Sequence, residues 1–248
     1  MRIETNEDLV NRNRKIATYM FIFSLIVLVL GFLAANGDAF GITFLAPEVY
    51  LAIMPILLVV GLAATLVSVR MTNYWIRMPR PEDAIKEGLK GLSNKSVLYN
   101  YLHLPARHVL ICPQGIFVIA TRFQDGRVEV NDDKWQTRRS PLSAVFSMFR
   151  MDGIGDPTAD AKKAAEHIQD YVDEVNADIK VQPIILFVDP RAKIEVGETS
   201  IPVLHADPKS HISLKDYLRK IPKEKRTPLT DEEVQAFEEA TIEYEETE

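Results

Sequence analysis

The sequence contains a single cysteine, Cys112, and this scarcity excludes a disulfide framework and a cysteine-based metal site. It also lacks a Gly-rich phosphate loop and a Gly-x-Ser-x-Gly elbow, so neither P-loop nor serine-hydrolase chemistry is indicated. Its 5 histidines show no metal-ligand spacing. Because Cys112 ends a predicted strand, we expect a buried, inert thiol in a reducing compartment. The alternative, a reactive thiol, requires exposure and a neighbouring cation.

Charged residues are absent from two long N-terminal stretches, residues 16–35 and 49–69. Each is long enough to cross a bilayer as a helix, and Pro55 inside the second is tolerated in membrane helices. Residues 34–37 make a poor signal-peptidase site, so we expect an uncleaved span. The alternative, two buried helices of a soluble protein, normally shows a polar stripe that these stretches lack. The sequence therefore predicts a transmembrane hairpin over residues 16–70.

Basic residues flank this hairpin, whereas its connecting loop has none. Arg12, Arg14 and Lys15 lie next to the first span and Arg70, Arg77 and Arg80 follow the second, while residues 36–48 contain Asp38 and Glu48 and no base. Under the positive-inside rule, we expect both termini and the main domain in the cytoplasm, with the protein crossing the plasma membrane twice. The lipid bilayer is thus the first expected partner.

Acidic residues are concentrated at the C-terminus, where residues 229–248 carry nine acids and no base. The rest of the chain has 26 acidic and 29 basic residues and is therefore slightly basic. This pattern is typical of a solvated surface, or of a body that contacts phosphate groups.

The acidic tail also has helical spacing. Thr230 precedes three acids as a helix cap, and Phe237 and Tyr244 lie on one predicted stripe. Such a stripe docks on the same domain or on a partner, and its acids could compete with phosphate for the basic body. A frayed, solvated helix is the alternative, because acidic repulsion disfavours the last turns.

Hydrophobic periodicity predicts the elements between hairpin and tail. Three consecutive strands form a meander over residues 107–130, with turns at Gly115 and Gly126. The other expected strands are Val97–Leu102, Pro183–Val188 and Ile201–His205, and the expected helices are Glu82–Leu92, a short one in 141–151, Thr158–Asn176 and His211–Ile221.

This order of elements predicts an α/β fold, a mixed sheet sandwiched by helices and preceded by the hairpin. Residues 1–15 are expected as a cytoplasmic N-terminal segment. The remaining boundaries are a linker at 71–81, a cytoplasmic domain at 82–221 and an acidic tail at 222–248.

Several positions in the expected domain match a known family pattern. From about Glu82 to Ile221, the sequence resembles the nuclease-related domain, a branch of the PD-(D/E)XK restriction-endonuclease-like fold. The matching positions are apolar or turn residues, so the resemblance supports the fold more than the function. They are His108–Ile111, Pro113, Gly115–Ile119, Gly126, Trp135 and the pair Asp156-Pro157 that opens the long helix.

The resemblance implies a catalytic site that this sequence does not reproduce. The family's chemistry uses an acid before the second strand and a Glu-x-Lys at the end of the third, which hold a divalent cation and activate water. Those positions are Arg107, Ala120 and Arg122 here, and a guanidinium cannot replace an oxygen ligand. The family's Asn-Pro-x-x-Gln signature is also altered, ending in Asp160. Glu82 is the only candidate for the family's helical acid.

Three hypotheses follow: a non-catalytic interaction or scaffold module, a divergent metal-dependent nuclease, and a structural subunit of a membrane complex. We favour the first, with a protein partner, no metal and no cofactor; nucleic acid is a further candidate partner. Magnesium belongs only to the nuclease alternative, which would need a migrated site built from Asp125, Glu129, Asp132 and Asp133. The candidate anion-binding residues are Arg107, Arg122 and Arg127, unless they pair with local acids such as Glu129.

Overall fold

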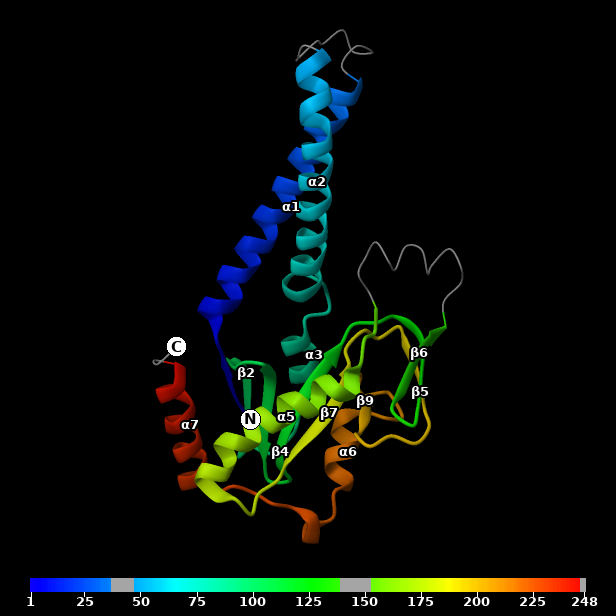
Figure 1. Cartoon of the computed structure of the whole chain (residues 1–248). Helices are drawn as coiled ribbons and strands as arrows, with labels where there is room; N and C mark the ends of the chain where they lie inside the picture. Colours follow the sequence, from blue (N-terminus) through cyan, green and yellow to red (C-terminus); the bar gives the residue numbers. More distant parts are fainter. Residues whose placement is uncertain (37–46, 139–152, 246–248) are drawn as a thin grey trace. The chain divides into compact units, whose positions relative to one another are not determined.

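A computed structural model describes residues 1–36, 47–138 and 153–245 (Figure 1). Among these residues, 7–36 and 47–78 form one compact unit. Residues 1–6, 79–138 and 153–245 form the other. We describe the two units separately, as a helical hairpin and a domain. The short helix expected within 141–151 lies outside the described residues.

The hairpin consists of two long helices, α1 (Glu7–Asn36) and α2 (Pro47–Trp75). Both are long and apolar enough to cross a membrane. Helix α2 continues into the expected linker, because nothing in residues 71–75 breaks a helix. It ends at Trp75. Apolar side chains along both helices, such as Phe21 and Leu58, are exposed instead of covered by protein.

Small residues line the contact between the two helices. Val10, Ala17 and Ser24 of α1 are buried at intervals of seven residues, the spacing of a left-handed helix pair. On α2, Gly61 approaches α1 so closely that an added Cβ would lie 3.3 Å from a methyl group of Val27. Ser68 is also buried. Small side chains thus allow the two backbones to approach each other.

Six strands form the main sheet of the domain, in the order β1-β2-β3-β4-β7-β9. Strands β2, β3 and β4 pair antiparallel as a meander, whereas β1, β7 and β9 join with parallel pairing. The strands are β1 (Arg2–Thr5), β2 (Val97–His103), β3 (Ala106–Cys112), β4 (Gly115–Arg122), β7 (Val181–Phe187) and β9 (Val203–His205).

The third strand of the expected meander belongs to a second, three-stranded sheet. Strand β5 (Gly126–Asn131) does not pair with β4. It pairs antiparallel with β6 (Lys134–Arg138) and parallel with β8 (Ala192–Val196). The predicted continuous meander is therefore wrong beyond Arg122, because backbone partners for β5 come from two strands that the sequence analysis did not find. Trp135 lies in β6.

Helices cover both faces of the main sheet, which confirms the predicted α/β sandwich (Figure 1). On one face, α3 (Pro81–Gly88) and α6 (Leu214–Lys220) bury Ile85 and Leu218 against the sheet. On the other face, α5 (Pro157–Asn176) buries Ile168. Alternation along β2 divides the strand between the two faces, so that Leu98 packs with α3 and Tyr99 packs on the α5 side.

The C-terminal helix α7 (Asp231–Glu245) packs on the α5 side of the same domain. Phe237 is fully buried, with its ring 5.2 Å from that of His103 and 6.1 Å from that of Tyr99. Thr230 caps the helix, as the sequence predicts, and Glu233 in turn accepts a hydrogen bond from the Thr230 N–H. Docking of the tail on its own domain is thus found for Phe237.

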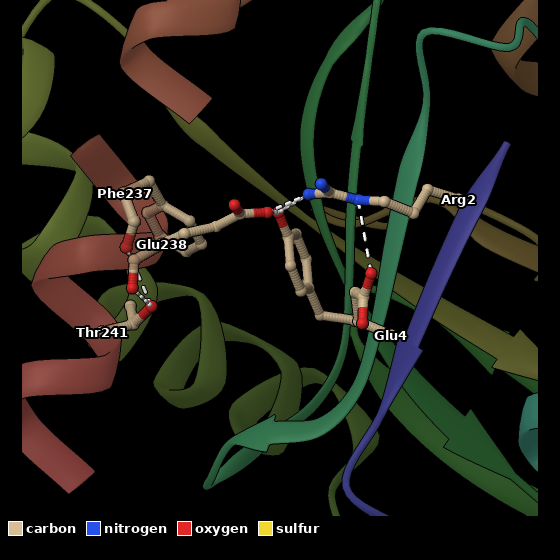
Figure 2. Close-up of polar contacts among 6 residues, drawn as sticks. Arg2, Glu4, Phe237, Glu238 and Thr241 are labelled. Atoms are coloured by element: carbon tan, nitrogen blue, oxygen red, sulfur yellow. Dashed lines mark hydrogen bonds and ion pairs between the residues drawn. The ribbon is translucent and has the colours of Figure 1, made fainter. Parts of the chain in front are cut away.

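The same helix also binds the N-terminal strand. The Glu238 carboxylate accepts hydrogen bonds from Arg2 on β1 and from the Tyr99 hydroxyl on β2, and Arg2 also lies 3.5 Å from Glu4 (Figure 2). Burial, followed by the Glu238 carboxylate, raises the pKa of Tyr99, so this hydroxyl remains a proton donor. Residues 1–6, expected within a separate N-terminal segment, therefore form the edge of the domain's sheet.

Candidate functional site

The positions singled out by the sequence gather at one end of the main sheet. Val109 of β3 pairs with Val118 of β4, and continuing this antiparallel register places Arg107 opposite Ala120. Ala120 in turn pairs with Ile185 of β7. Since side chains alternate along a strand, Arg107, Ala120 and Arg122 belong to the face covered by α5.

Arg122 forms an ion pair with α5. One of its guanidinium nitrogens, Nη2, donates to Asp160 Oδ2 at 2.6 Å, and the other, Nη1, donates to the Thr121 carbonyl at 3.0 Å. The Arg122 side chain is only 14% exposed, whereas the Asp160 side chain is 68% exposed. Two positions at which the sequence departs from the family pattern are therefore in direct contact.

The start of α5 explains the position of Asp160. The Asp156 carboxylate accepts a hydrogen bond from the Ala159 N–H at 3.0 Å and caps the helix, and Pro157 occupies its first turn. Asp160 is therefore in the first turn of α5, where a negative charge is favoured by the helix dipole. The same capping motif that resembles the family signature places a carboxylate beside β4.

His108, the neighbour of Arg107, is fully buried on the other face of β3. Its Nδ1 lies 2.8 Å from Asn100 Oδ1, and its ring packs edge-on against Tyr101, with centroids 5.0 Å apart. Burial, followed by the positive charge of Arg107, lowers the pKa of His108 to about 3. His108 is therefore neutral near neutral pH, and its packing and hydrogen bond indicate a structural role.

Glu82 lies at the same end of the sheet as Arg107. The Tyr101 hydroxyl donates to Glu82 Oε2 at 3.0 Å. Tyr101 has a φ of 60°, within the irregularity that interrupts pairing between Asn100 and His103. Sequence analysis missed Tyr101; no spacing rule predicts a strand tyrosine in the left-handed region. Glu82, the candidate for the family's helical acid, is therefore connected by a hydrogen bond from α3 to Tyr101 of β2.

Arg127, the third candidate anion-binding residue, belongs to the second sheet. Its Nε lies 3.0 Å from Glu195 on the neighbouring strand β8. It is therefore placed on a different sheet from Arg107 and Arg122, and its charge is matched by a local acid.

Three of the four acids considered for a migrated metal site have separate partners. Glu129 pairs with Arg138 at 2.7 Å, and Asp125 lies 3.4 Å from Arg191. Asp133 accepts hydrogen bonds from the hydroxyl and N–H of Ser200, which lower its pKa. Within residues 1–36, 47–138 and 153–245, no three histidine, cysteine or acidic side chains are grouped so that they could hold a metal ion.

Cys112 lies at the opposite end of β3 from Arg107. It is buried, and its thiol contacts the Gly115 carbonyl at 3.6 Å. Burial raises the pKa of this thiol to about 11, so the thiolate is scarce at neutral pH. This environment is that of a structural cysteine.

A family model described as Nuclease-related domain (NERD) matches residues 80–188. These residues are a nuclease-related domain. The match extends from the start of α3 to the end of β7, and it includes Arg107, Ala120 and Arg122. No curated protein and no solved structure matches the chain. Helices α1, α2 and α7 and strand β1 lie outside the matched NERD segment.

The side chains at the expected metal-ligand positions of this NERD domain do not fit a divalent cation. Magnesium requires oxygen ligands, whereas Arg107 and Arg122 offer only N–H donors and Ala120 offers a methyl group. Asp160 has the correct ligand chemistry, but its carboxylate is bonded to Arg122. The arrangement can instead attract an anion, provided that the anion replaces Asp160 at the Arg122 guanidinium.

Proposed function

We propose that the protein is a membrane-anchored NERD domain that does not cleave nucleic acid and acts as an interaction or scaffold module. The observation that carries this proposal is the ion pair between Arg122 and Asp160. It connects two positions where the family pattern has a lysine and a glutamine, and it lies beside the position where Ala120 replaces a ligand. A salt bridge thus stands where the family's chemistry would hold a cation.

Electrostatics supports this proposal. A divalent cation at this end of the sheet would lie beside two guanidinium groups, Arg107 and Arg122, of which the second is largely buried. Like charges repel strongly where water is scarce, so cation binding is disfavoured there even if Glu82 supplies one ligand. An acidic partner meets the opposite situation, because a phosphate or carboxylate can exchange with Asp160 at Arg122.

Attachment to the membrane through both helices is supported by strand β1. This strand precedes α1, yet it pairs in parallel with β2, which follows α2. A sheet cannot form across a bilayer, so the N-terminus and the domain belong on one side of any membrane that the helices cross. Two crossings satisfy this requirement, and the basic flanks of the hairpin favour the cytoplasmic side of the plasma membrane.

A cleavage assay tests the catalytic part of the proposal. The purified full chain in detergent, supplied with magnesium or manganese, is expected to leave DNA and RNA intact. If the chain cleaves either substrate, the variants Glu129→Gln and Asp132→Asn identify the origin of the activity. Cleavage that persists through stringent purification and disappears in either variant would establish a divergent nuclease instead of a scaffold.

Cysteine labelling tests the membrane topology. A cysteine introduced at Gly41, between the two spans, should react with an impermeant maleimide added to intact cells. A cysteine at Glu232, in the tail, should react only after the cells are lysed. Native Cys112 is buried and contributes little background. The reverse labelling pattern would show that the orientation is inverted.

A further inference from the structure

A group of exposed basic side chains follows helix α6. We define the basic segment as Arg219, Lys220, Lys223 and Lys225, all of which are exposed. Within the described part of the chain, none of the four has a carboxylate within ion-pairing distance. Residues 214–226 contain six basic and two acidic side chains, so the surface charge here is clearly positive.

The basic segment has a defined conformation. Leu214 and Leu218 fix α6 in the core, and Ser213 caps it. After α6, Arg226 donates two hydrogen bonds to the Ile221 carbonyl, at 3.1 and 3.2 Å. These bonds span the short helix η2 (Lys223–Lys225) and connect its two ends. The four cations are therefore held close together on one short stretch, which reduces the entropic cost of binding.

Helix α7 of the acidic tail packs on a different face of the sheet from α6, which leads into the basic segment. Phe237 anchors α7 in the core on the α5 side, whereas α6 packs on the other face of the sheet. Glu238 is bonded to Arg2 and Tyr99, and Glu233 accepts from Asn176 at 2.7 Å. Glu233 and Glu238, two described acids of the tail, are therefore bonded to residues outside the basic segment.

We infer that the basic segment binds the phosphate backbone of a nucleic acid. Four unpaired cations without an apolar anchor are suited to a polyanion, because phosphate binding is driven by charge and counterion release. A protein partner normally requires buried aromatic or aliphatic anchors. The exposed large apolar side chains of the described domain, Leu104 and Val196, lie outside residues 214–226.

The basic segment and the chain connections to the hairpin helices lie at opposite ends of the sheet. Thr227 lies against Gly115, where an added Cβ would be 3.2 Å from its hydroxyl, so the segment is at the turn between β3 and β4. The two segments that connect the domain with helices α1 and α2 lie at the other end of the sheet. There, the Asn6 N–H donates to the Asn100 carbonyl, and the Tyr101 hydroxyl donates to Glu82. Neither connection adjoins the segment.

Oligonucleotide binding tests this inference independently of catalysis. The full chain in neutral-lipid nanodiscs is titrated with a fluorescent single strand of about 16 nucleotides in EDTA, which prevents metal-dependent cleavage. The test variant carries Arg219→Gln, Lys220→Gln, Lys223→Gln and Lys225→Gln. The control variant loses the same charge from exposed lysines scattered over the domain: Lys95→Gln, Lys134→Gln, Lys163→Gln and Lys193→Gln.

The test variant should bind at least tenfold more weakly than the wild type, while the control changes by less than about threefold. For about three to four phosphate contacts, wild-type affinity should fall roughly 20- to 50-fold between about 50 and 200 mM salt, and the test variant should show a shallower slope. The double variant Lys223→Gln/Lys225→Gln, confined to exposed side chains, should show part of the loss and guards against misfolding of the fourfold variant.

Three outcomes would overturn the inference. Equal losses in the test and control variants would attribute binding to net charge alone. Tighter, segment-dependent binding to phosphatidylserine vesicles would identify a lipid surface, and stronger competition by poly-glutamate than by unlabelled oligonucleotide would identify an acidic protein. Nuclease activity measured separately would bear on the proposed function and not on this surface.

Discussion

Asp160, in the first turn of α5, is bonded to Arg122 at the end of β4. The contact connects two residues that are 38 positions apart in the chain, and it lies at the end of the sheet where the resemblance implies catalytic groups. Because Arg122 is largely buried and Asp160 is largely exposed, the arginine depends on this carboxylate more than the carboxylate depends on the arginine.

The first prediction concerns this pair. Replacing Asp160 with Asn should lower the free energy of unfolding by about 1 kcal/mol, because the mostly buried Arg122 guanidinium loses the negative charge of Asp160, while solvent screening at Asp160 limits the effect. The control, Asp170→Asn on an exposed position of the same helix, should be nearly neutral. Chemical denaturation followed by tryptophan fluorescence measures both. Equal effects would show that the pair contributes nothing specific.

The docking of α7 gives the second prediction. Phe237→Ala removes a fully buried ring and should destabilise the packing of the tail by about 3–5 kcal/mol. Amide hydrogen exchange in residues 231–241 should become fast, whereas exchange in α5 should change little. The matched variant Glu232→Gln alters an exposed side chain of the same helix and should leave exchange slow. Unchanged protection in Phe237→Ala would mean that the ring does not hold α7.

Two glycines of the hairpin provide the third prediction. A leucine at Gly61 must displace Val27, so it should separate the helices and lower stability by about 1–3 kcal/mol. An added Cβ at Gly31 meets no heavy atom of the described residues within 4 Å, so a leucine should be tolerated there. Thermal unfolding of the detergent-solubilised chain, together with spin-label distances between α1 and α2, compares the two. Similar behaviour of both variants would argue against this helix contact.

The fourth prediction concerns pH. Burial lowers the pKa of His103 to about 4 and that of His108 to about 3, from ordinary values near 6.5. As pH falls, these histidines are protonated in the unfolded chain before they are protonated in the folded chain. Their contribution to folding stability is therefore fully present above about pH 6.5 and is lost as pH falls toward 4. At about pH 5, each histidine should lower the free energy of unfolding by about 2 kcal/mol relative to neutral pH.

Denaturation midpoints between about pH 7 and pH 5 check this expectation. His103→Gln should make the decline in stability less steep, because one proton fewer is taken up on unfolding. The exposed residue His211 supplies the comparison, since His211→Gln removes a histidine without removing a buried one. A wild-type midpoint that does not change over this range would contradict the assignment of buried, neutral histidines.

The sequence predicted the main sheet well because apolar periodicity directly encodes burial. Val109–Ile111 and Ile116–Ile119 are buried strands as expected, and so is the run that forms β7. Local capping chemistry was equally informative: Asp156-Pro157 and Thr230 both begin helices where predicted.

The sequence could not show pairings that depend on distant segments. Strand β1 has only four residues, and its partner, Val97, lies far along the chain. Strand β5 alternates as expected, but nothing local indicates that it leaves β4 to pair with β8. The contacts of Asp160 with Arg122 and of Tyr101 with Glu82 likewise arise only when a helix packs on a strand.

Manganese binding to the full chain, measured by electron paramagnetic resonance, tests the central claim most directly. The account predicts no specific site at millimolar Mn²⁺ in the unmodified chain. A variant with Arg107→Asp, Ala120→Glu, Arg122→Lys and Asp160→Gln restores the family pattern and should gain one site. The account is contradicted if the unmodified chain binds one Mn²⁺ ion and Glu82→Gln abolishes that binding.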